Sequence, residues 1–200
     1  NEIRNKRKEI GLNLIKMMEN HLLDLQLNNA KFEITFNEID ENNIVFNKDG
    51  IDVIDFLVSF NKGEPLKPLS KTASGGELSR FMLALKTVLG DKLPMQTKIF
   101  DEIDSGVSGS IAYSIGKKLE NIAVSSQVLC ITHLPQVASI ANNHYKISKG
   151  IIEERTFTKV ELLDSEKRIY EIDANTIEMM GASSGVSSSG TSSNGDIVKF

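Results

Sequence analysis

The sequence predicts an α/β fold: a mixed sheet flanked by helices, preceded by an antiparallel portion. Residues 128–132 are almost continuously apolar, which suits a strand buried on both faces of a parallel sheet. Residues 31–36 alternate polar and apolar side chains, as in a half-buried strand. Residues 77–89 repeat apolar side chains at helical spacing and end before Gly90, so we expect a helix there.

The remaining elements follow from the same patterns. A long amphipathic helix is predicted over residues 2–24, where apolar residues at helical spacing stand between charges. Further along the chain we expect a strand at 54–60, helices at 108–123, 134–141 and 168–180, and an antiparallel pair of strands at 145–148 and 156–162 that turns near Gly150.

The last twenty residues differ in composition from the rest. Residues 181–195 are mostly serine and glycine, which predicts a flexible linker because such a segment buries little apolar surface. Residues 196–200 are predicted to add a strand to an edge of the sheet. Native divergence and an artificial extension both explain this tail.

Composition bounds the class of protein. The chain has 200 residues, which suits one domain, and a net charge of −4, which gives no sign of non-specific nucleic-acid binding but leaves a local basic patch open. The single cysteine, Cys130, is predicted to be a buried inert thiol. No apolar run is long enough to span a membrane and no secretory signal opens the chain, so we expect a cytoplasmic protein.

Two adjacent acids follow the short strand 98–100. Successive side chains of a strand point to opposite faces, so Asp101 and Glu102 can do different work. One carboxylate can hold a magnesium ion through water, and the other can act as general base. A solvated strand end is the alternative.

A helix begins near residues 72–77. Ser74 can cap the helix and Glu77 can complete a capping box, while Gly75 and Gly76 allow a ligand to approach the backbone closely. The positive end of the helix dipole suits an anion such as a terminal phosphate. An ordinary capped helix explains the same residues.

A histidine ends the strand 128–132. His133 is expected at the carboxyl end of that strand, where open α/β sheets bind their ligands. Alone it would be read as a surface or capping residue. Because the helix start, the acids and the histidine occur together, we interpret them as parts of one site.

These motifs in this order resemble the C-terminal half of an ABC-type ATPase head. Residues 74–77 resemble the signature motif, 99–102 the Walker B motif and 104–106 the D-loop, and His133 resembles the switch histidine. Over roughly residues 1–172 the chain is similar to the RecN family of bacterial DNA-repair ATPases, relatives of the structural-maintenance-of-chromosomes (SMC) proteins. The resemblance is based on the amino-acid sequence of the motifs at residues 69–80, 99–109 and 131–138.

One motif of such heads is missing. No glycine-rich phosphate loop (Walker A, G-x-x-x-x-G-K-[ST]) occurs in the sequence. In this family it lies in an N-terminal lobe, which a long coiled coil separates from the C-terminal lobe. The resemblance therefore implies a partial, P-loop NTPase-like head: residues 1–30 end the coiled coil and connect it, 31–180 form the C-terminal lobe, and 181–200 are linker and tail.

The resemblance also implies roles, with ATP and Mg²⁺ as cofactors. Ser74, Gly75, Gly76 and Glu77 would contact ATP held by the phosphate loop of another subunit. Asp101 would support Mg²⁺ and Glu102 would polarise water. His133 would sense the γ-phosphate, and Asp104 would couple the two sites across the interface.

The implied partners are DNA, the N-terminal lobe and a second head, in a homodimer closed on ATP. The implied function is repair of DNA double-strand breaks by recombination, in the bacterial cytoplasm at the nucleoid. This chain alone is expected to be inactive, because the Walker A loop is absent. The alternative is a non-catalytic, ATP-gated clamp that acts on DNA or on partner proteins.

Overall fold

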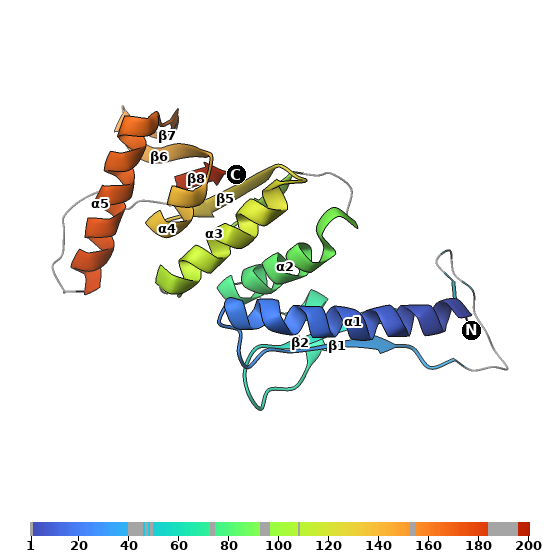
Figure 1. Ribbon diagram of the computed structural model, residues 1–200. Coiled ribbons are helices and arrows are strands. Elements are labelled where there is room, and N and C mark those ends of the chain that lie inside the picture. The colour runs from blue at the N-terminus through green and yellow to red at the C-terminus, as the bar shows by residue number, and fades with distance from the viewer. Residues whose placement is uncertain are drawn as a thin grey trace. The chain divides into compact units, whose positions relative to one another are not determined.

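The computed structural model describes residues 2–39, 46, 48, 50–72, 75–92, 97–107, 109–152, 155–183 and 196–200. The chain forms two compact units, Asn1–Ala84 (unit 1) and Leu85–Phe200 (unit 2), drawn in Figure 1. These two units are not the predicted segments 1–30, 31–180 and 181–200, and that predicted division remains a prediction. No helix in the described part of the chain is long and apolar enough to cross a membrane.

Unit 1 combines one long helix with a small antiparallel sheet. Helix α1 (Glu2–Asp24) precedes strands β1 (Lys31–Phe36), β2 (Ile54–Ser59) and β3 (Lys67–Pro68), with β2 in the centre. A short 3₁₀ turn, η1 (Leu69–Lys71), leads towards helix α2 (Gly76–Leu89), which crosses the boundary between the units, and η2 (Gly90–Lys92) follows. The predicted helix, strands and antiparallel portion are confirmed.

Aromatic residues and a close helix–sheet approach hold the core of unit 1. Phe32 makes edge-to-face contacts with Phe56 and Phe81, at centroid distances of 5.6 and 5.2 Å. A Cβ atom at Gly11 of α1 would lie 3.6 Å from Cδ1 of Ile34, so the helix packs closely on β1 at this point. Other apolar residues of α1 are exposed: Ile3, Ile10, Leu12, Met17 and Leu23.

A buried carboxylate ties the first turns of α1 to the segment before β2. Asp52 is 8% exposed and accepts hydrogen bonds from Arg4 at 2.5 Å and from Arg7 at 2.7 Å. Arg4 also donates to the backbone oxygen of Asn37, which follows β1. The hydrogen bond from Arg7 is the largest of the contributions that hold the pKa of Asp52 below its ordinary value.

This pKa shift predicts a pH-dependent loss of stability. Because the folded-state pKa of Asp52 is lowered, its contacts with Arg4 and Arg7 stabilise the fold fully at pH values above the ordinary carboxyl pKa of 3.8. This stabilisation is lost as the pH falls through the folded-state pKa. Asp52→Asn should therefore lower the melting temperature at pH 7, and the difference from wild type should shrink on acidification. Circular dichroism melts across pH 2–7 test this. Asp55→Asn, at an exposed position of β2, is the matched control, and an equal loss there would contradict the assignment.

Unit 2 is built on a mixed five-stranded sheet in the order β4-β5-β8-β6-β7. Its strands are β4 (Lys98–Phe100), β5 (Val128–Thr132), β6 (Asn143–Ile152), β7 (Arg155–Leu162) and β8 (Asp196–Lys199). Strands β4 and β5 run parallel, and the other neighbours run antiparallel. Helices α3 (Gly109–Ala123), α4 (Pro135–Ile140) and α5 (Ser165–Ser183) belong to this unit (Figure 1).

Close packing and carbonyl capping join the three helices. A Cβ atom at Gly116 in α3 would lie 2.6 Å from Cδ1 of Ile140 in α4, so a larger residue there would force the Ile140 side chain to move. The guanidinium group of Arg168 on α5 donates to the backbone oxygens of Ala138, at 2.7 Å, and of Ala141. These bonds satisfy carbonyl groups at the end of α4, which an isolated helix leaves unpaired.

Three sequence predictions are corrected in unit 2. The turn near Gly150 is wrong, because Gly150 pairs with Phe157 inside the β6–β7 ladder and the strands continue to the pair Ile152↔Arg155. Helix α5 extends to Ser183, so the predicted linker begins too early; its remainder, 184–195, lies outside the described residues. Strand β8 lies between β5 and β6 rather than at an edge, because both strands offer it main-chain pairing.

Candidate functional site

The predicted acids and histidine lie at one edge of the unit 2 sheet. In the parallel β4–β5 pair Phe100 is opposite Cys130. Asp101 and Glu102 follow β4, and His133 follows β5, so all three leave the sheet at its carboxyl edge. The prediction that Glu102 and His133 end adjacent parallel strands is confirmed. This is the edge at which α/β sheets bind ligands.

Glu102 has an unusual backbone conformation. Its φ of +55° places it in the left-handed region, which only Gln26 shares among the described residues other than glycine. The backbone N–H of Glu102 donates to Oδ1 of Asp101 at 2.9 Å, and both side chains are exposed. Non-glycine residues in this region are strained and cluster at functional sites.

Asp104 has contacts that the sequence did not predict. It is 3% exposed, and its Oδ2 accepts hydrogen bonds from Oγ1 of Thr132 at 2.5 Å and from the backbone N–H of His133 at 3.1 Å. Nδ1 of His133 lies 3.5 Å from the same oxygen. Thr132 in turn accepts from the N–H of Leu134 at 3.0 Å. The hydrogen bond between Asp104 and Thr132 joins the loop after β4 to the end of β5. Because Glu102 is in that loop and His133 follows β5, this bond limits how far the two residues can move apart.

Removing the Thr132 hydroxyl should destabilise unit 2. Thr132→Val keeps the shape but leaves a buried carboxylate and the Leu134 N–H without this partner, at a cost of about 1–3 kcal/mol. All three tyrosines, Tyr113, Tyr145 and Tyr170, are in unit 2 and the chain has no tryptophan, so tyrosine fluorescence during urea unfolding reports on this unit. Thr132→Ser keeps the hydroxyl, so its free energy of unfolding should fall much less. An equal fall in the two variants would mean that packing, and not the hydrogen bond, causes the effect.

The signature segment lies in unit 1, at the start of α2. The N–H of Ser79 donates to the oxygen of Gly75 at 3.0 Å, so Gly75 directly precedes α2 and accepts its first hydrogen bond, and Glu77 is in the first turn. Gly75 has φ +155°, a conformation that L side chains rarely adopt, and a Cβ there would have nothing within 4 Å. Ser74 lies outside the described residues.

A pocket of about 360 Å³, with both polar and apolar lining, adjoins this helix start. Gly75, Gly76 and Glu77 line it together with two lysines, Lys67 and Lys71. The lysine side chains and the N–H groups of the first helical turn are suited to an anion. Nothing local in the sequence shows that these lysines share a pocket with the glycines.

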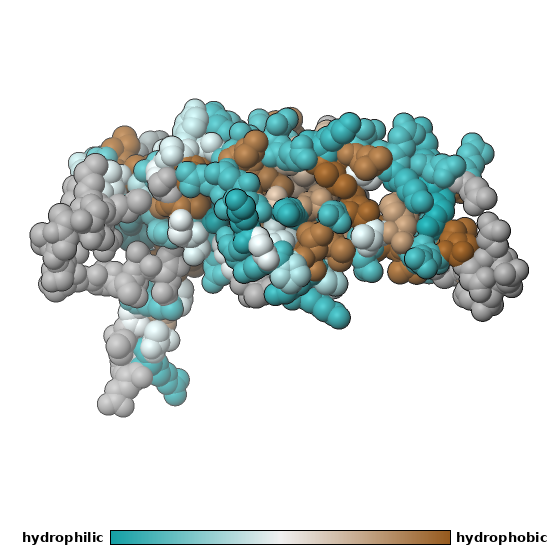
Figure 2. Space-filling model, turned by 90° about the horizontal axis from the view of Figure 1, so that it is seen from below, coloured by the Kyte–Doolittle hydropathy of each residue, from teal (hydrophilic) through white to brown (hydrophobic). Residues whose placement is uncertain are grey.

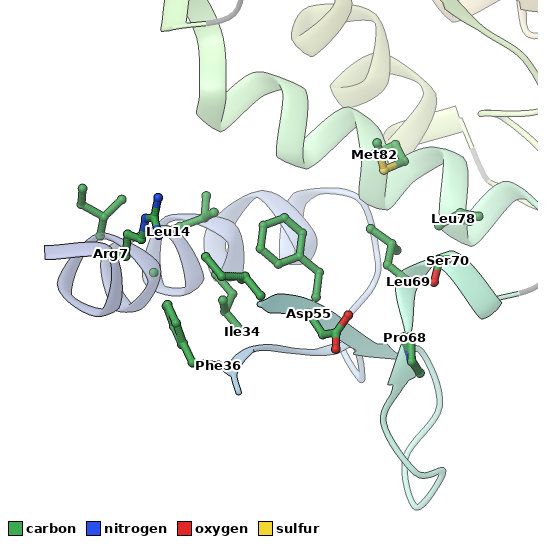
Figure 3. Close-up of a pocket in the computed structure, with 14 residues that line it drawn as sticks. Arg7, Leu14, Ile34, Phe36, Asp55, Pro68, Leu69, Ser70, Leu78 and Met82 are labelled. Atoms are coloured by element: carbon green, nitrogen blue, oxygen red, sulfur yellow. The ribbon is translucent and has the colours of Figure 1, made fainter. Parts of the chain in front are cut away.

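A larger pocket of unit 1 is apolar and is lined by none of the predicted site residues. It has a volume of about 750 Å³ and lies between α1, the β1–β2 strands, η1 and α2 (Figure 3). Leu14, Ile34, Phe36, Leu69 and Met82 are among the residues that line it. Hydrophobic residues also gather on the surface of this part of the chain in Figure 2.

The described residues contain no cluster of three or more His, Cys, Asp or Glu side chains that could hold a metal ion. Asp101 and the neighbouring Glu102 fit a magnesium ion that keeps most of its water and takes its other ligands from phosphates. Cys130 is buried, as predicted, and burial is the largest cause that raises the pKa of its thiol far above its ordinary value.

The fold is similar to that of a solved head domain. The chain resembles the crystal structure of the Smc head domain with a coiled coil and joint from Pyrococcus yayanosii, with a TM-score of 0.50 and 17% identity over 88% of this chain and 32% of that one. The expected α/β ATPase-head fold is thus confirmed.

Sequence comparison identifies the particular relatives. The chain is 45% identical to the DNA repair protein RecN of Halalkalibacterium halodurans over 168 residues, 84% of this chain and 30% of that protein. It is 51% identical to RecN of Bacillus subtilis over 123 residues, 62% of this chain and 21% of that protein. No family model matches the chain. The chain is therefore RecN-related, as its motifs predicted, and it spans less than a third of the length of these relatives.

Proposed function

We propose that this chain supplies one half of a composite ATP-hydrolysing site in a RecN-like DNA-repair protein. The observation that supports this most is the parallel β4–β5 pair, which brings Asp101, Glu102 and His133 to one edge of the sheet. The relationship to RecN makes nucleotide hydrolysis the reaction to consider. The strained backbone of Glu102 adds to this, because such strain is retained where a fold needs it.

Each residue has a role that follows from its chemistry. Glu102 is exposed at the sheet edge and acts as the general base that polarises the attacking water. Asp101 orients a magnesium ion through water; the ion would neutralise charge on the transferred phosphoryl group. His133 contacts the γ-phosphate, and its main chain is held by Asp104.

The signature segment acts on nucleotide from another subunit. Gly75, Gly76 and Glu77, with Ser74 before them in the sequence, present a helix start and the pocket beside it to the γ-phosphate. The phosphate loop that grips this nucleotide comes from an N-terminal lobe, so closure on ATP joins two heads in a homodimer. Asp104 couples the two sites through the loop that it fastens to β5. DNA is the partner of the whole protein, in the bacterial cytoplasm at the nucleoid.

This chain by itself should hydrolyse ATP at background. Positioning and charge neutralisation of the phosphates supply most of phosphoryl-transfer catalysis, and the sequence has no phosphate loop. Phosphate release by the purified 200-residue chain should equal that of its Glu102→Gln variant, with and without Mg²⁺. Steady magnesium-dependent turnover that the substitution abolishes would show that the chain is a complete ATPase and that the composite site is wrong.

A further inference from the structure

Strand β8 occupies a position between two strands that do not pair with each other. It is antiparallel to β5 on one side, from Leu129↔Lys199 to Thr132↔Asp196, and to β6 on the other. Both of its main-chain edges are therefore paired, which is how a sheet binds an added peptide strand. We call the space between β5 and β6 that holds residues 196–200 the β8 site.

Side chains of the β8 site recognise an acidic residue. Oδ2 of Asp196 lies 2.9 Å from Nε2 of His144, and its Oδ1 accepts a hydrogen bond from the N–H of Ile147 at 3.1 Å. His144 is fully buried, and its Nδ1 has no hydrogen-bond partner among the described residues. A strand without this carboxylate would leave the buried imidazole without its Asp196 partner, so the site selects an acid at this position.

Apolar contacts select the residues two and four positions later. Val198 is fully buried beside Cys130 and His144, its partners in the two ladders. Phe200 is 7% exposed, and its N–H donates to the oxygen of Val128 at 3.1 Å. The recognised pattern is an extended segment with an acid, then a β-branched residue, then an aromatic residue at alternate positions.

None of these contacts uses the covalent connection of β8 to α5, which runs through residues 184–195. We propose that the β8 site is a peptide-binding site for extended acidic–apolar segments, and that residues 196–200 are an exchangeable ligand which a second copy of the chain can also supply. Attachment to the same chain favours the chain's own strand through its high effective concentration. The bound segment is only five residues long, so a free peptide of the same length can make the same main-chain and side-chain contacts.

Cys130 provides a direct probe of this exchange. It is the chain's single cysteine, it is fully buried, and it lies opposite Val198 in the β5–β8 ladder. Paired residues of an antiparallel ladder are close enough for a disulfide. The probe is a synthetic peptide of residues 194–200 with cysteine in place of Val198, activated as a mixed disulfide with a small thiol. Cys130 is buried while β8 occupies the site, so it reacts only when the peptide takes the place of β8: its sulfur then attacks the peptide sulfur, forms the new disulfide and releases the small thiol.

The wild-type 200-residue chain should capture this peptide, measured by intact mass. A peptide with asparagine in place of Asp196 should be captured roughly tenfold more slowly, because it loses the charge-assisted hydrogen bonds. Only the peptide changes, so folding of the protein is not at issue. Equal capture of the two peptides, or none while Cys130 reacts readily after unfolding, would overturn the proposal.

Supply by a second copy is tested with two chains. Wild type is mixed with a Cys130→Ser, Val198→Cys double variant under oxidation; neither chain can form an internal disulfide, since each has one cysteine. A disulfide-linked heterodimer is the expected product. The control moves the cysteine by one residue, with Lys199→Cys in place of Val198→Cys, because Lys199 pairs with Leu129. A heterodimer yield as high in the control would overturn strand supply between copies.

Discussion

Replacing Glu102 with glutamine in the longer protein is expected to lower ATP turnover by about 10²–10⁴-fold, the usual contribution of a general base. Glutamine keeps the size of the side chain but cannot accept the proton from water. Nucleotide binding should persist, because Glu102 is exposed at the sheet edge and its side chain has no role in the Asp104–Thr132 pair. Steady-state phosphate release, measured beside nucleotide affinity, tests the prediction.

A matched control removes the same charge elsewhere in unit 2. Glu120 is on α3 and forms an ion pair with Lys117 at 2.8 Å, so Glu120→Gln should change turnover little. Equal losses in the two variants, or loss of nucleotide binding together with hydrolysis, would contradict the role of Glu102. DNA repair that continues in cells carrying a hydrolysis-deficient Glu102→Gln protein would favour the non-catalytic, ATP-gated clamp.

Replacing Ser74 with arginine in the longer protein is expected to block ATP-dependent dimerisation and hydrolysis while each monomer still binds ATP. The reason is the open helix start next to it: Gly75 and Gly76 line a pocket in which an anion supplied by another subunit can be bound. Because Ser74 directly precedes Gly75 in the sequence, we expect a long side chain there to exclude the γ-phosphate. We expect dimer affinity to fall by about 100-fold or more, which corresponds to about 2.8 kcal/mol.

The measurement combines nucleotide affinity with sedimentation in ATP, in a Glu102→Gln background that preserves the closed state. Ser74→Ala is the size control: it removes the hydroxyl without adding bulk, so dimerisation should weaken far less. A Ser74→Arg protein that still dimerises on ATP would refute the in-trans role of the signature segment. So would a monomer that loses nucleotide affinity as severely as it loses turnover.

The elements of this fold were predictable where local pattern and burial agree. The continuous apolar run of residues 128–132 predicted β5, and the helical spacing of residues 77–89 with Gly90 after it predicted α2. The place of His133 followed, because it is the first residue after β5. These features depend on residues near one another in the chain, and side-chain periodicity reports them directly.

Contacts between distant residues could not be read in this way. The carboxyl group of Asp104 and the hydroxyl of Thr132 are 28 positions apart, and no spacing rule connects them. Lys98 is a charged residue in the short strand β4, yet it is 6% exposed and its ammonium group donates to the hydroxyl of Ser126. A buried polar residue is tolerated when the fold brings it a partner, and the sequence does not name that partner.

The sequence by itself determined the motifs of the candidate site and the strands and helices that carry them, because hydrophobic periodicity and helix-start chemistry are local. Only the tertiary structure decided the sheet order, with β8 between β5 and β6, and the pairing of His144 with Asp196 across 52 positions. The physical reason is that a strand shows which faces it buries but not which neighbour completes its hydrogen bonds. That choice depends on every other strand in the sheet.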